Sequence, residues 1–468
     1  MKDNNNKKEV NRRNFFKIAG TTAVGTTAAL YGCKPDNNVS IDVGVADEVP
    51  TDKMTYRINH NTGDKVSLLG YGCMRWPLRK KADGEEEIDQ DAVNELVDYA
   101  IAHGVNYFDT APVYVRGWSE TSTGIALKRH PRDKFFIATK LSNMRGDPQL
   151  RTFEGSKNLY EKSKHDLQVD YLDYYLLHYI GSGGMKDLRE RFYDNGILDF
   201  LVKEREAKRI RNLGWSFHGD IECFDFLLSQ MDDGKVHWDF VMIQLNYVDW
   251  LHATGINTNA EYLLGELEKR NIPTIVMEPL LGGRLARLNI EALNILKTMR
   301  PEASAASWAF RYAGSPKSVL TVLSGIVYRE YLQENIRTYS PLDPISEQEY
   351  AALEKVTSLI LDADYVQCTE CEYCMPCPYG LDIPGIFGHY NRIVSANKKL
   401  KTSKDKNYRE ARQAFLVGYD RSVPKLRQAN HCTNCTICGP KCPQRINIPK
   451  EMQRVDLYAE QLKQKTEF

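Results

Sequence analysis

The sequence has no excess of charge of either sign, because its 62 Lys and Arg residues equal its 62 Asp and Glu residues in number. A basic surface is the electrostatic mark of nucleic-acid binding, so the composition gives no reason to expect a nucleic-acid partner. The chain also lacks a G-x-G-x-x-G segment, which disfavours a doubly wound dinucleotide-binding sheet. Only three of its 11 cysteines, Cys33, Cys73 and Cys223, lie outside two groups near the C-terminus. This odd remainder gives no basis for a framework of disulfides.

The other cysteines form two short runs, and each run ends in Cys-Pro. The second run has the C-x2-C-x2-C-x3-C-P spacing typical of bacterial two-cluster ferredoxins, in which the fourth cysteine ligates the other cluster. Thiolates at such spacing suit iron–sulfur clusters or zinc, but zinc sites more often use two separated C-x2-C pairs. We therefore expect two 4Fe-4S clusters, with a pair of four-cysteine zinc sites as the alternative. The cysteines are Cys368, Cys371, Cys374 and Cys377 in the first cysteine run and Cys432, Cys435, Cys438 and Cys442 in the second.

The resemblance to ferredoxins implies that the ligands cross over between the two runs. One cluster would take Cys368, Cys371, Cys374 and Cys442, and the other would take Cys432, Cys435, Cys438 and Cys377. The stretch between the runs is mostly polar and has helical patterning, as in NYREARQAFLVGYD, and similar segments, DIPGIF and NIPKEM, follow the two runs. We therefore expect an α-helical ferredoxin-type domain over residues 346–468, whose clusters move electrons one at a time.

The middle of the chain alternates short β-branched or aromatic runs with helical patterns such as AVNELVDYAIAHG and YLLGELEKRN. Apolar strands that alternate with helices indicate a parallel sheet covered on both faces. Eight such runs predict an α/β fold, a closed (β/α)8 TIM barrel over residues 54–345, whose catalytic residues lie at the C-terminal ends of the strands. The expected strands are residues 66–70, 106–110, 135–140, 172–178, 211–217, 240–245, 273–279 and 319–325.

The segments NYFDTAPVY, FFIATK and YLLH follow one another along the expected strands. By these segments the chain resembles the aldo/keto reductase family, roughly from residue 54 to residue 340. The resemblance implies an oxidoreductase with a catalytic tetrad of Asp109, Tyr114, Lys140 and His178. It also implies a branch of the family in which an iron–sulfur domain follows the barrel.

The tetrad offers the side chains that carbonyl reduction needs. Tyr114 can donate a proton to the carbonyl oxygen, although a free phenol has a pKa of about 10. We expect the ammonium group of Lys140 to lower this pKa by favouring the phenolate, and Asp109 to hold Lys140 charged and in place. His178 would donate a hydrogen bond to the carbonyl oxygen and stabilise the charge that develops there.

The resemblance also implies a nicotinamide cofactor, NADP or NAD, bound tightly if the protein is exported. It places the cofactor-binding positions at Ser216, Gln244, Gly325 and Asn335. Ser216 and Gln244 correspond to the residues that hold the nicotinamide carboxamide in the family. Gly325 and Asn335 belong to the phosphate-binding segment LSGIVYREYLQEN.

Several of these positions depart from the family pattern. Phe217 replaces the asparagine beside the serine, and Met277 replaces the aromatic residue that stacks on the nicotinamide. Gly325 and Tyr331 stand where NADP-dependent members carry a lysine and an arginine, and Arg329 could compensate in part. The choice among NADP, NAD and a flavin therefore stays open from the sequence.

The N-terminus has the features of an export signal in the usual order. Arg12 and Arg13, within NRRNFFK, resemble the twin-arginine pattern. The stretch IAGTTAVGTTAAL that follows is too short and too rich in Gly and Thr to span a bilayer, and is typical of a signal peptide. It ends at LYGC, which resembles a lipobox with Cys33 as the lipidated residue. We expect a signal over residues 1–33, a linker over 34–53, and a periplasmic protein whose only membrane contact is a lipid anchor.

Two functions remain open from the sequence alone. The first is an exported oxidoreductase that reduces a carbonyl or oxidises an alcohol, with Tyr114 as general acid/base and the two clusters as electron relay. The second is a lipid-anchored electron-transfer protein that uses the barrel as a docking scaffold without nicotinamide chemistry. The complete tetrad favours the first, whereas Phe217 and Met277 keep the second open. A redox partner protein is expected in both cases, and a small carbonyl or alcohol substrate in the first.

The arginine pair and the cysteine that ends the apolar stretch give a test of location. Changing Arg12 and Arg13 together to lysine should keep the precursor in the cytoplasm, because the signal needs the arginine pair. Cys33→Ala should release the exported protein from the membrane. Cell fractionation with detection of the full chain measures both effects, and normal export of the double-lysine variant would contradict the assignment.

Overall fold

The structure is a computed structural model that describes residues 48–464 apart from residues 145–146, 256, 401 and 403. The described residues belong to one compact unit. The expected signal with Arg12, Arg13 and Cys33, and most of the expected linker, lie outside the described residues. No helix among the described residues is both long enough and apolar enough to cross a membrane.

Eight parallel strands close into a barrel, in the order β10-β11-β12-β3-β6-β7-β8-β9. The predicted (β/α)8 barrel is therefore confirmed. The sheet closes because strands from the start and the end of the barrel sequence pair, with Leu69 to Gly72 beside Val322 to Gly325. The strands are β3 (Leu69–Gly72), β6 (Tyr107–Asp109), β7 (Phe136–Leu141), β8 (Leu172–Ile180), β9 (Ile210–Phe217), β10 (Phe240–Gln244), β11 (Thr274–Met277) and β12 (Val319–Gly325).

The first expected strand, residues 66–70, is divided in the structure. Its first part belongs to β2 (Lys65–Ser67), which pairs antiparallel with β1 (Tyr56–Ile58), and the barrel strand β3 begins only at Leu69. The turn of this hairpin contains Asn59, which is fully buried and donates hydrogen bonds to Tyr174 Oη at 3.1 Å and to Asn212 Oδ1 at 3.0 Å. Since both partners lie near the starts of their strands, the hairpin closes the N-terminal end of the barrel.

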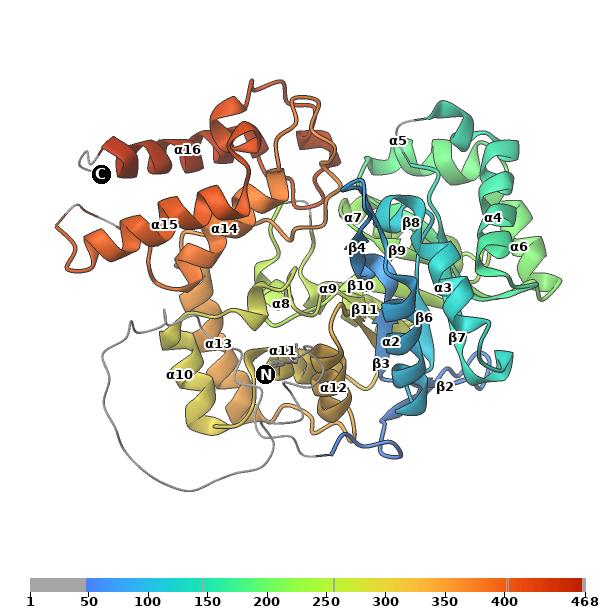
Figure 1. Cartoon of the computed structure of the whole chain (residues 1–468). Coiled ribbons are helices and arrows are strands. Elements are labelled where there is room, and N and C mark those ends of the chain that lie inside the picture. Colours follow the sequence, from blue (N-terminus) through green and yellow to red (C-terminus); the bar gives the residue numbers. More distant parts are fainter. Residues whose placement is uncertain (1–47, 145–146, 256, 401, 403, 465–468) are drawn as a thin grey trace, which may run out of the picture. The chain divides into compact units, whose positions relative to one another are not determined.

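Helices surround the strands, and side chains fill the interior. Figure 1 shows α3, α4, α6 and α7 around the strands β6 to β9. The outer helices are α2 (Gln90–Ala102), α3 (Ser119–Leu127), α4 (Phe153–Leu167), α6 (Ile197–Glu206), α7 (Ile221–Asp232), α9 (Ala260–Lys269), α10 (Ile290–Met299), α11 (Ala305–Gly314) and α12 (Arg329–Thr338). Shorter elements in the loops are β4 (Leu78–Lys80), β5 (Glu86–Ile88), α5 (Gly184–Leu188) and α8 (Asp249–His252). The side chains in the barrel interior include Tyr107, Ala138, Tyr174, Leu176, Phe240, Met242 and Ile275.

Helix α13 (Glu347–Leu361) packs with the barrel rather than with the cysteine runs. It begins with a capping box in which Ser346 and Glu349 bond each other's backbone N–H groups, an arrangement that satisfies two donors at a helix start. Its side chains Val356 and Ile360 belong to the hydrophobic core around the barrel, whereas the second core begins at Val366. By packing, the two domains therefore meet between residues 361 and 366 rather than at residue 346.

The C-terminal domain is helical over its described residues, as expected. It contains α14 (Ile383–Ser395), α15 (Tyr408–Ser422) and α16 (Ile448–Gln464). The similar segments that follow the two cysteine runs both start helices. Asp382 Oδ1 accepts a hydrogen bond from Gly385 N at 3.0 Å, and Asn447 Oδ1 accepts one from Lys450 N at 3.2 Å. These side chains satisfy backbone donors at the helix starts. The core between the helices includes Ile386, Phe387, Phe415, Met452 and Val455.

Removing the Asn59 side chain should destabilise the barrel from its closed end. In Asn59→Ala, the buried Tyr174 hydroxyl and Asn212 carboxamide each lose a partner, so the free energy of unfolding should fall by about 1–3 kcal/mol. Thermal or urea denaturation of the intact protein measures the loss. Asn61→Ala is the matched control, because it removes one partly buried bond to Asp239 O. Equal losses in the two variants would contradict the prediction.

Candidate active site and iron–sulfur centres

The four residues of the predicted tetrad lie together at the C-terminal ends of neighbouring strands. Asp109 ends β6, Lys140 and His178 lie near the ends of β7 and β8, and Tyr114 starts the 3-10 segment Tyr114–Gly117 that follows β6. The centroids of the Tyr114 and His178 rings are 6.0 Å apart, and Lys140 Nζ lies 4.8 Å from the centroid of the Tyr114 ring. Strand pairing thus brings together side chains that are distant in sequence.

Asp109 and Lys140 form a buried ion pair, with side chains only 3% and 1% exposed. Lys140 Nζ donates hydrogen bonds to Asp109 Oδ1 at 2.5 Å and to the Thr110 carbonyl oxygen at 2.8 Å. Burial raises the pKa of Asp109, and the charge of Lys140 acts in the opposite direction. Asp109 Oδ2 is buried without a hydrogen-bond partner among the described residues. The ammonium group is therefore held at a defined place beside the Tyr114 ring.

The pKa of Tyr114 differs from our expectation. It is raised well above its ordinary value, first by the removal of the hydroxyl group from water and then by the negative charges of Asp109, Cys73 and Glu278. The expectation of a lowered pKa is wrong for this arrangement, because burial and the negative charge of Asp109 outweigh the effect of the Lys140 ammonium group, which Asp109 itself engages. Tyr114 is therefore a phenol, and not a phenolate, at neutral pH.

His178 is a neutral imidazole in this site. Burial lowers its pKa well below the ordinary value, and the positive charges of Lys140, His218 and Arg191 lower it further. Its Nδ1 is hydrogen-bonded to Ser142 Oγ at 2.7 Å. Because Nδ1 is engaged in this way, Nε2 is the ring nitrogen that can form a hydrogen bond with a ligand. The tautomer decides whether Nε2 donates or accepts that bond.

The segment that follows His178 has a strained backbone that a buried arginine supports. Tyr179 has φ +66°, which is unusual for a residue with a side chain. Arg191 Nη2 donates to the His178 carbonyl oxygen at 2.6 Å, and Arg191 Nη1 donates to the Tyr179 carbonyl oxygen at 3.4 Å. Asp187 Oδ2 pairs with Arg191 at 3.2 Å, and Ser216 Oγ accepts from Tyr179 N at 3.0 Å. These contacts fix the orientation of the His178 ring.

The predicted cofactor-binding side chains already have partners within the protein. Ser216 Oγ accepts from the backbone N–H after His178, as described above. The Gln244 carboxamide donates to the buried carboxylate of Asp249. Asn335 Nδ2 donates to Ser324 Oγ at 2.9 Å. Each of these three side chains therefore has one of its polar atoms engaged within the protein.

The barrel mouth near Gly325 is in contact with the first cysteine run. The Arg75 side chain lies beside Gly325, and its Nη2 donates to the carbonyl oxygens of Thr369 and Glu370, both at 3.2 Å. The backbone of the loop after β11 touches the same run, because a Cβ atom on Gly282 would lie 2.3 Å from Thr369 Cα. The run thus covers the strand ends where the resemblance placed the phosphates of a dinucleotide.

Phe217 and Met277, two of the positions that depart from the family pattern, both pack within the barrel. The Phe217 ring packs against Trp215 and Phe224, with centroids 6.4 and 5.1 Å away, and so belongs to the layer between strands and helices. Met277 packs against the barrel interior and offers no aromatic surface. At these two positions the protein therefore offers neither the asparagine nor the stacking aromatic ring that the resemblance implies for a bound nicotinamide.

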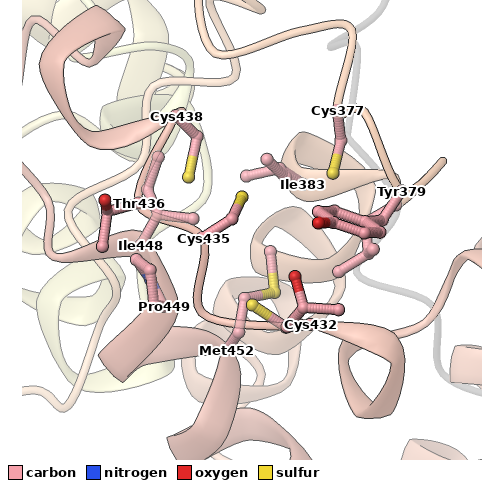
Figure 2. A pocket seen from close by; sticks show the side chains of 12 residues that line it. Cys377, Tyr379, Ile383, Cys432, Cys435, Thr436, Cys438, Ile448, Pro449 and Met452 are labelled. Carbon is pink, nitrogen blue, oxygen red and sulfur yellow. The ribbon is translucent and has the colours of Figure 1, made fainter.

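Three cysteines of the second run share one cavity with the last cysteine of the first run. Cys432, Cys435, Cys438 and Cys377 line this cavity together with apolar side chains such as Met452. Figure 2 shows the four cysteine side chains around one space. The structure thus brings together the four residues expected for one of the crossed clusters, and a 4Fe-4S cluster held by four thiolates fits this donor set.

The other four cysteines also lie near one another. Burial raises the pKa of the Cys368 thiol to about 12, and the neighbouring Cys371 and Cys442 raise it as well. The Cys374 thiol has its pKa raised by burial and then by Cys371, Cys368 and Cys442. Cys442 is thus among the thiols that act on the first run, as Cys438 is on Cys374, and the crossed ligand set stays a prediction. Among the described residues, no three His, Cys, Asp or Glu side chains surround a point that would suit a single metal ion.

Several residues of the site escaped prediction from the sequence. Tyr373, between two cysteines of the first run, stacks near Tyr179 at the barrel mouth with ring centroids 5.4 Å apart. Nothing in the sequence relates Tyr373, Arg75 or Arg191 to the ends of the strands, because these contacts depend on loop paths. The sequence does point to Glu278, because it is a polar residue near the end of an expected strand, residues 273–279.

Comparison with known sequences agrees with this geometry. The model of the aldo/keto reductase family matches residues 68–358, and that of a 4Fe-4S dicluster domain matches residues 367–447. The chain is 24% identical over 324 residues to L-galactose dehydrogenase from Arabidopsis thaliana, which covers 66% of this chain and 95% of that protein. It is 37% identical over 153 residues to a probable aldo-keto reductase 1 from Glycine max, covering 32% of this chain and 41% of that protein.

Solved structures share the barrel. An aldo-keto reductase from Klebsiella pneumoniae in complex with NADPH has a TM-score of 0.50 and 21% identity, covering 65% of this chain and 96% of that one. A holo aldo-keto reductase from Bacillus halodurans has a TM-score of 0.50 and 22% identity with the same coverage. At these identities the likeness concerns the fold. The chain therefore belongs to the aldo/keto reductase family of oxidoreductases, and it carries a 4Fe-4S dicluster domain after the barrel.

Proposed function

We propose that the protein is an exported iron–sulfur oxidoreductase that acts on a carbonyl or alcohol group, with Tyr114 as the general acid/base. The main support is the assembly of Asp109, Tyr114, Lys140 and His178 at the mouth of the barrel. The contact of the first cysteine run with this same mouth gives the cysteine domain a direct relation to the site.

The raised pKa of Tyr114 favours carbonyl reduction over alcohol oxidation. Reduction needs a proton donor, and the phenol is the form present at neutral pH. The oxygen of a carbonyl becomes strongly basic as its carbon is reduced, so even a weak acid can protonate it. Alcohol oxidation needs a base instead, and the phenolate is disfavoured by burial and by the negative charge of Asp109.

The other three residues would support this proton transfer. The ammonium group of Lys140 stabilises the negative charge that appears on Tyr114 when its proton leaves, and Asp109 holds Lys140 in place. A neutral His178 can donate a hydrogen bond from Nε2 to the carbonyl oxygen without adding a full charge. Ser142 and the backbone contacts of Arg191 keep the imidazole oriented.

The eight cysteines of the two runs would hold two 4Fe-4S clusters, which supply single electrons when bound. We assign Cys377 to the cluster of the second run and Cys442 to that of the first, which is supported by the grouping of the thiols. Reduction of a carbonyl to an alcohol takes two electrons and two protons. A redox partner protein would supply the two electrons, one by way of each cluster, while Tyr114 would give the proton to oxygen and water the proton to carbon. We further propose the periplasm as the location, with Cys33 as a lipid anchor, on the basis of the N-terminal sequence pattern.

Loss of the phenol hydroxyl should slow turnover without preventing binding. For Tyr114→Phe we expect a fall in kcat of about 10²–10⁴-fold with a nearly unchanged KM, because only the proton donor is lost. Anaerobic reduction of small aldehydes by reduced methyl viologen measures the rate. Tyr328→Phe removes a hydroxyl from an exposed tyrosine and serves as control. Wild-type turnover in Tyr114→Phe would instead favour the docking-scaffold function.

The same assay has an expected pH dependence. The raised pKa of Tyr114 keeps its acid form present up to about pH 9, and the lowered pKa of His178 keeps the imidazole neutral down to about pH 6. Neither group should therefore titrate between these values, and kcat for reduction should be flat there. A fall in kcat with a midpoint near pH 6.5, the ordinary value for histidine, would contradict the neutral state of His178.

Single-cysteine variants test the crossed ligand arrangement. Cys442→Ala should give the same iron loss and the same electron paramagnetic resonance spectrum as Cys371→Ala, and Cys377→Ala should match Cys435→Ala. The wild-type protein should carry about eight irons, the sum for two 4Fe-4S clusters. Cys223→Ala, which removes a buried thiol outside both runs, is the control. If Cys442→Ala matches Cys435→Ala instead, each run holds its own cluster; zinc in the protein would refute the clusters.

A further inference from the structure

The C-terminal domain contacts the loops at the catalytic end of the barrel in several places. On one side Arg75 bonds Thr369 and Glu370, as described, and Arg284 Nη1 bonds Gln367 Oε1 at 2.5 Å. Arg284 is half-buried, and this bond joins it to the residue before the first cysteine run. The loops after β3 and β11 are therefore both engaged by the first cysteine run and the residue before it.

The second cysteine run and the residues after it contact two further loops. Arg445 Nη2 donates to the Ser182 carbonyl oxygen at 2.5 Å, after β8. Asn257 Nδ2 donates to Gln444 Oε1 at 3.1 Å, after β10, and a Cβ atom on Gly255 would lie 2.6 Å from the Gln444 carbonyl oxygen. Since active sites of these barrels are built from the loops after the strands, the cysteine domain forms part of the wall of the site.

Charged groups of both signs lie at the loop after β11, and their hydrogen bonds are made within the protein. Glu278 Oε2 accepts from Gly282 N at 2.6 Å, so a backbone donor of this loop is already used by a carboxylate. Burial raises the pKa of Glu278 and the charge of Asp249 raises it further, whereas the charge of Arg75 lowers it. Arg75 and Arg284 direct their guanidinium groups at the first cysteine run and the residue before it. The phosphates of a dinucleotide would have to displace that run to reach these arginines.

Tyr373 connects the first cysteine run with the tetrad. It lies between Cys371 and Cys374 in sequence, and its ring is 5.4 Å from that of Tyr179, the residue after His178. The Tyr179 ring in turn lies 6.3 Å from the His178 ring. A ligand at Tyr114 and His178 would therefore have the aromatic side chain of Tyr373 as a neighbour.

We propose that the barrel mouth binds a small, uncharged carbonyl compound and no dinucleotide, because the first cysteine run fills the dinucleotide's place and supplies Tyr373 as a wall of the substrate site. The substrate class rests on the proposed function, whereas the exclusion of the dinucleotide does not. A protein built in this way needs no soluble nicotinamide, which agrees with the proposed export. Tyr373 is here a substrate-binding residue that the C-terminal domain contributes to the barrel.

Nucleotide binding to the full-length, anaerobically purified holoprotein tests the exclusion directly. Titration with NADPH and NADP⁺ in a calorimeter should give no saturable binding up to about 1 mM, the upper end of usual KM values. Saturable binding of either nucleotide in this range would overturn the proposal. Because no turnover is measured, the result does not depend on whether Tyr114 proves to be the acid.

Two adjacent glycines give a matched test of the contact itself. Gly282→Ala should push the first cysteine run away, because its Cβ would overlap Thr369. Gly283→Ala is the control, since Gly283 has a similar positive φ, +92° against +65°, but no atom within 4 Å of the added Cβ. Hydrogen exchange in a peptide covering residues 367–374 should rise in Gly282→Ala only. Equal exchange in the two variants would overturn the proposal. Should Gly282→Ala fail to fold, Arg75→Gln, which weakens the bonds to Thr369 and Glu370, should raise the same exchange, and no rise would overturn it.

The role of Tyr373 needs a separate readout. Tyr373→Ala should raise KM for small aldehydes about tenfold or more with a smaller change in kcat, because a wall of the substrate site is lost while the tetrad stays intact. Tyr262→Ala removes an exposed tyrosine on the outer helix α9 and serves as control. An unchanged KM in Tyr373→Ala would overturn this part of the proposal. If Tyr114→Phe is also fully active, the proposed function fails as well, and the two failures are thereby distinguished.

Discussion

The buried ion pair between Asp109 and Lys140 is the interaction on which the arrangement of the site depends. Removing both charges from water costs several kcal/mol per ion, which only a close partner offsets. The register of the sheet supplies that partner, because Asp109 pairs with Ala138 and Lys140 follows two residues later on the same face of β7. A shift of one residue would turn Lys140 to the other face. The barrel therefore has to close in this register for the charges to meet, and Tyr114 is placed relative to that pair.

The second constraint is that both ends of the barrel are covered. The β1–β2 hairpin covers the N-terminal end, and the cysteine domain covers the catalytic end. Asn59 and the β1–β2 hairpin fill the N-terminal end through buried hydrogen bonds. At the catalytic end the first cysteine run contacts the loops after β3 and β11. In our proposal the site is limited to the surroundings of Tyr114, His178 and Tyr373. In our proposal this space suits a small substrate and leaves the reducing electrons to the neighbouring clusters.

The sequence predicted much of the fold, for reasons that particular residues make clear. Strands such as β8 and β12 begin and end close to where their apolar runs do, because a strand buried on both faces must be apolar throughout. The first strand was misplaced, because VSLLG is continuous in sequence but a hairpin ends within it. Helix α13 packs with the barrel core, although it follows the expected boundary at residue 346, because an amphipathic pattern does not show which core a helix joins.

The sequence by itself determined the barrel, the order of the tetrad along the chain and the two cysteine runs, since each depends on local pattern or on the spacing of a few residues. Only the tertiary structure decided how these parts act on one another. Burial and the charge of Asp109 raise the pKa of Tyr114, although the lysine beside it suggested the opposite. The positions expected to bind a dinucleotide found partners within the protein, such as Asp249 for Gln244. Burial, charge and contact depend on residues distant in sequence, and a linear pattern does not contain them.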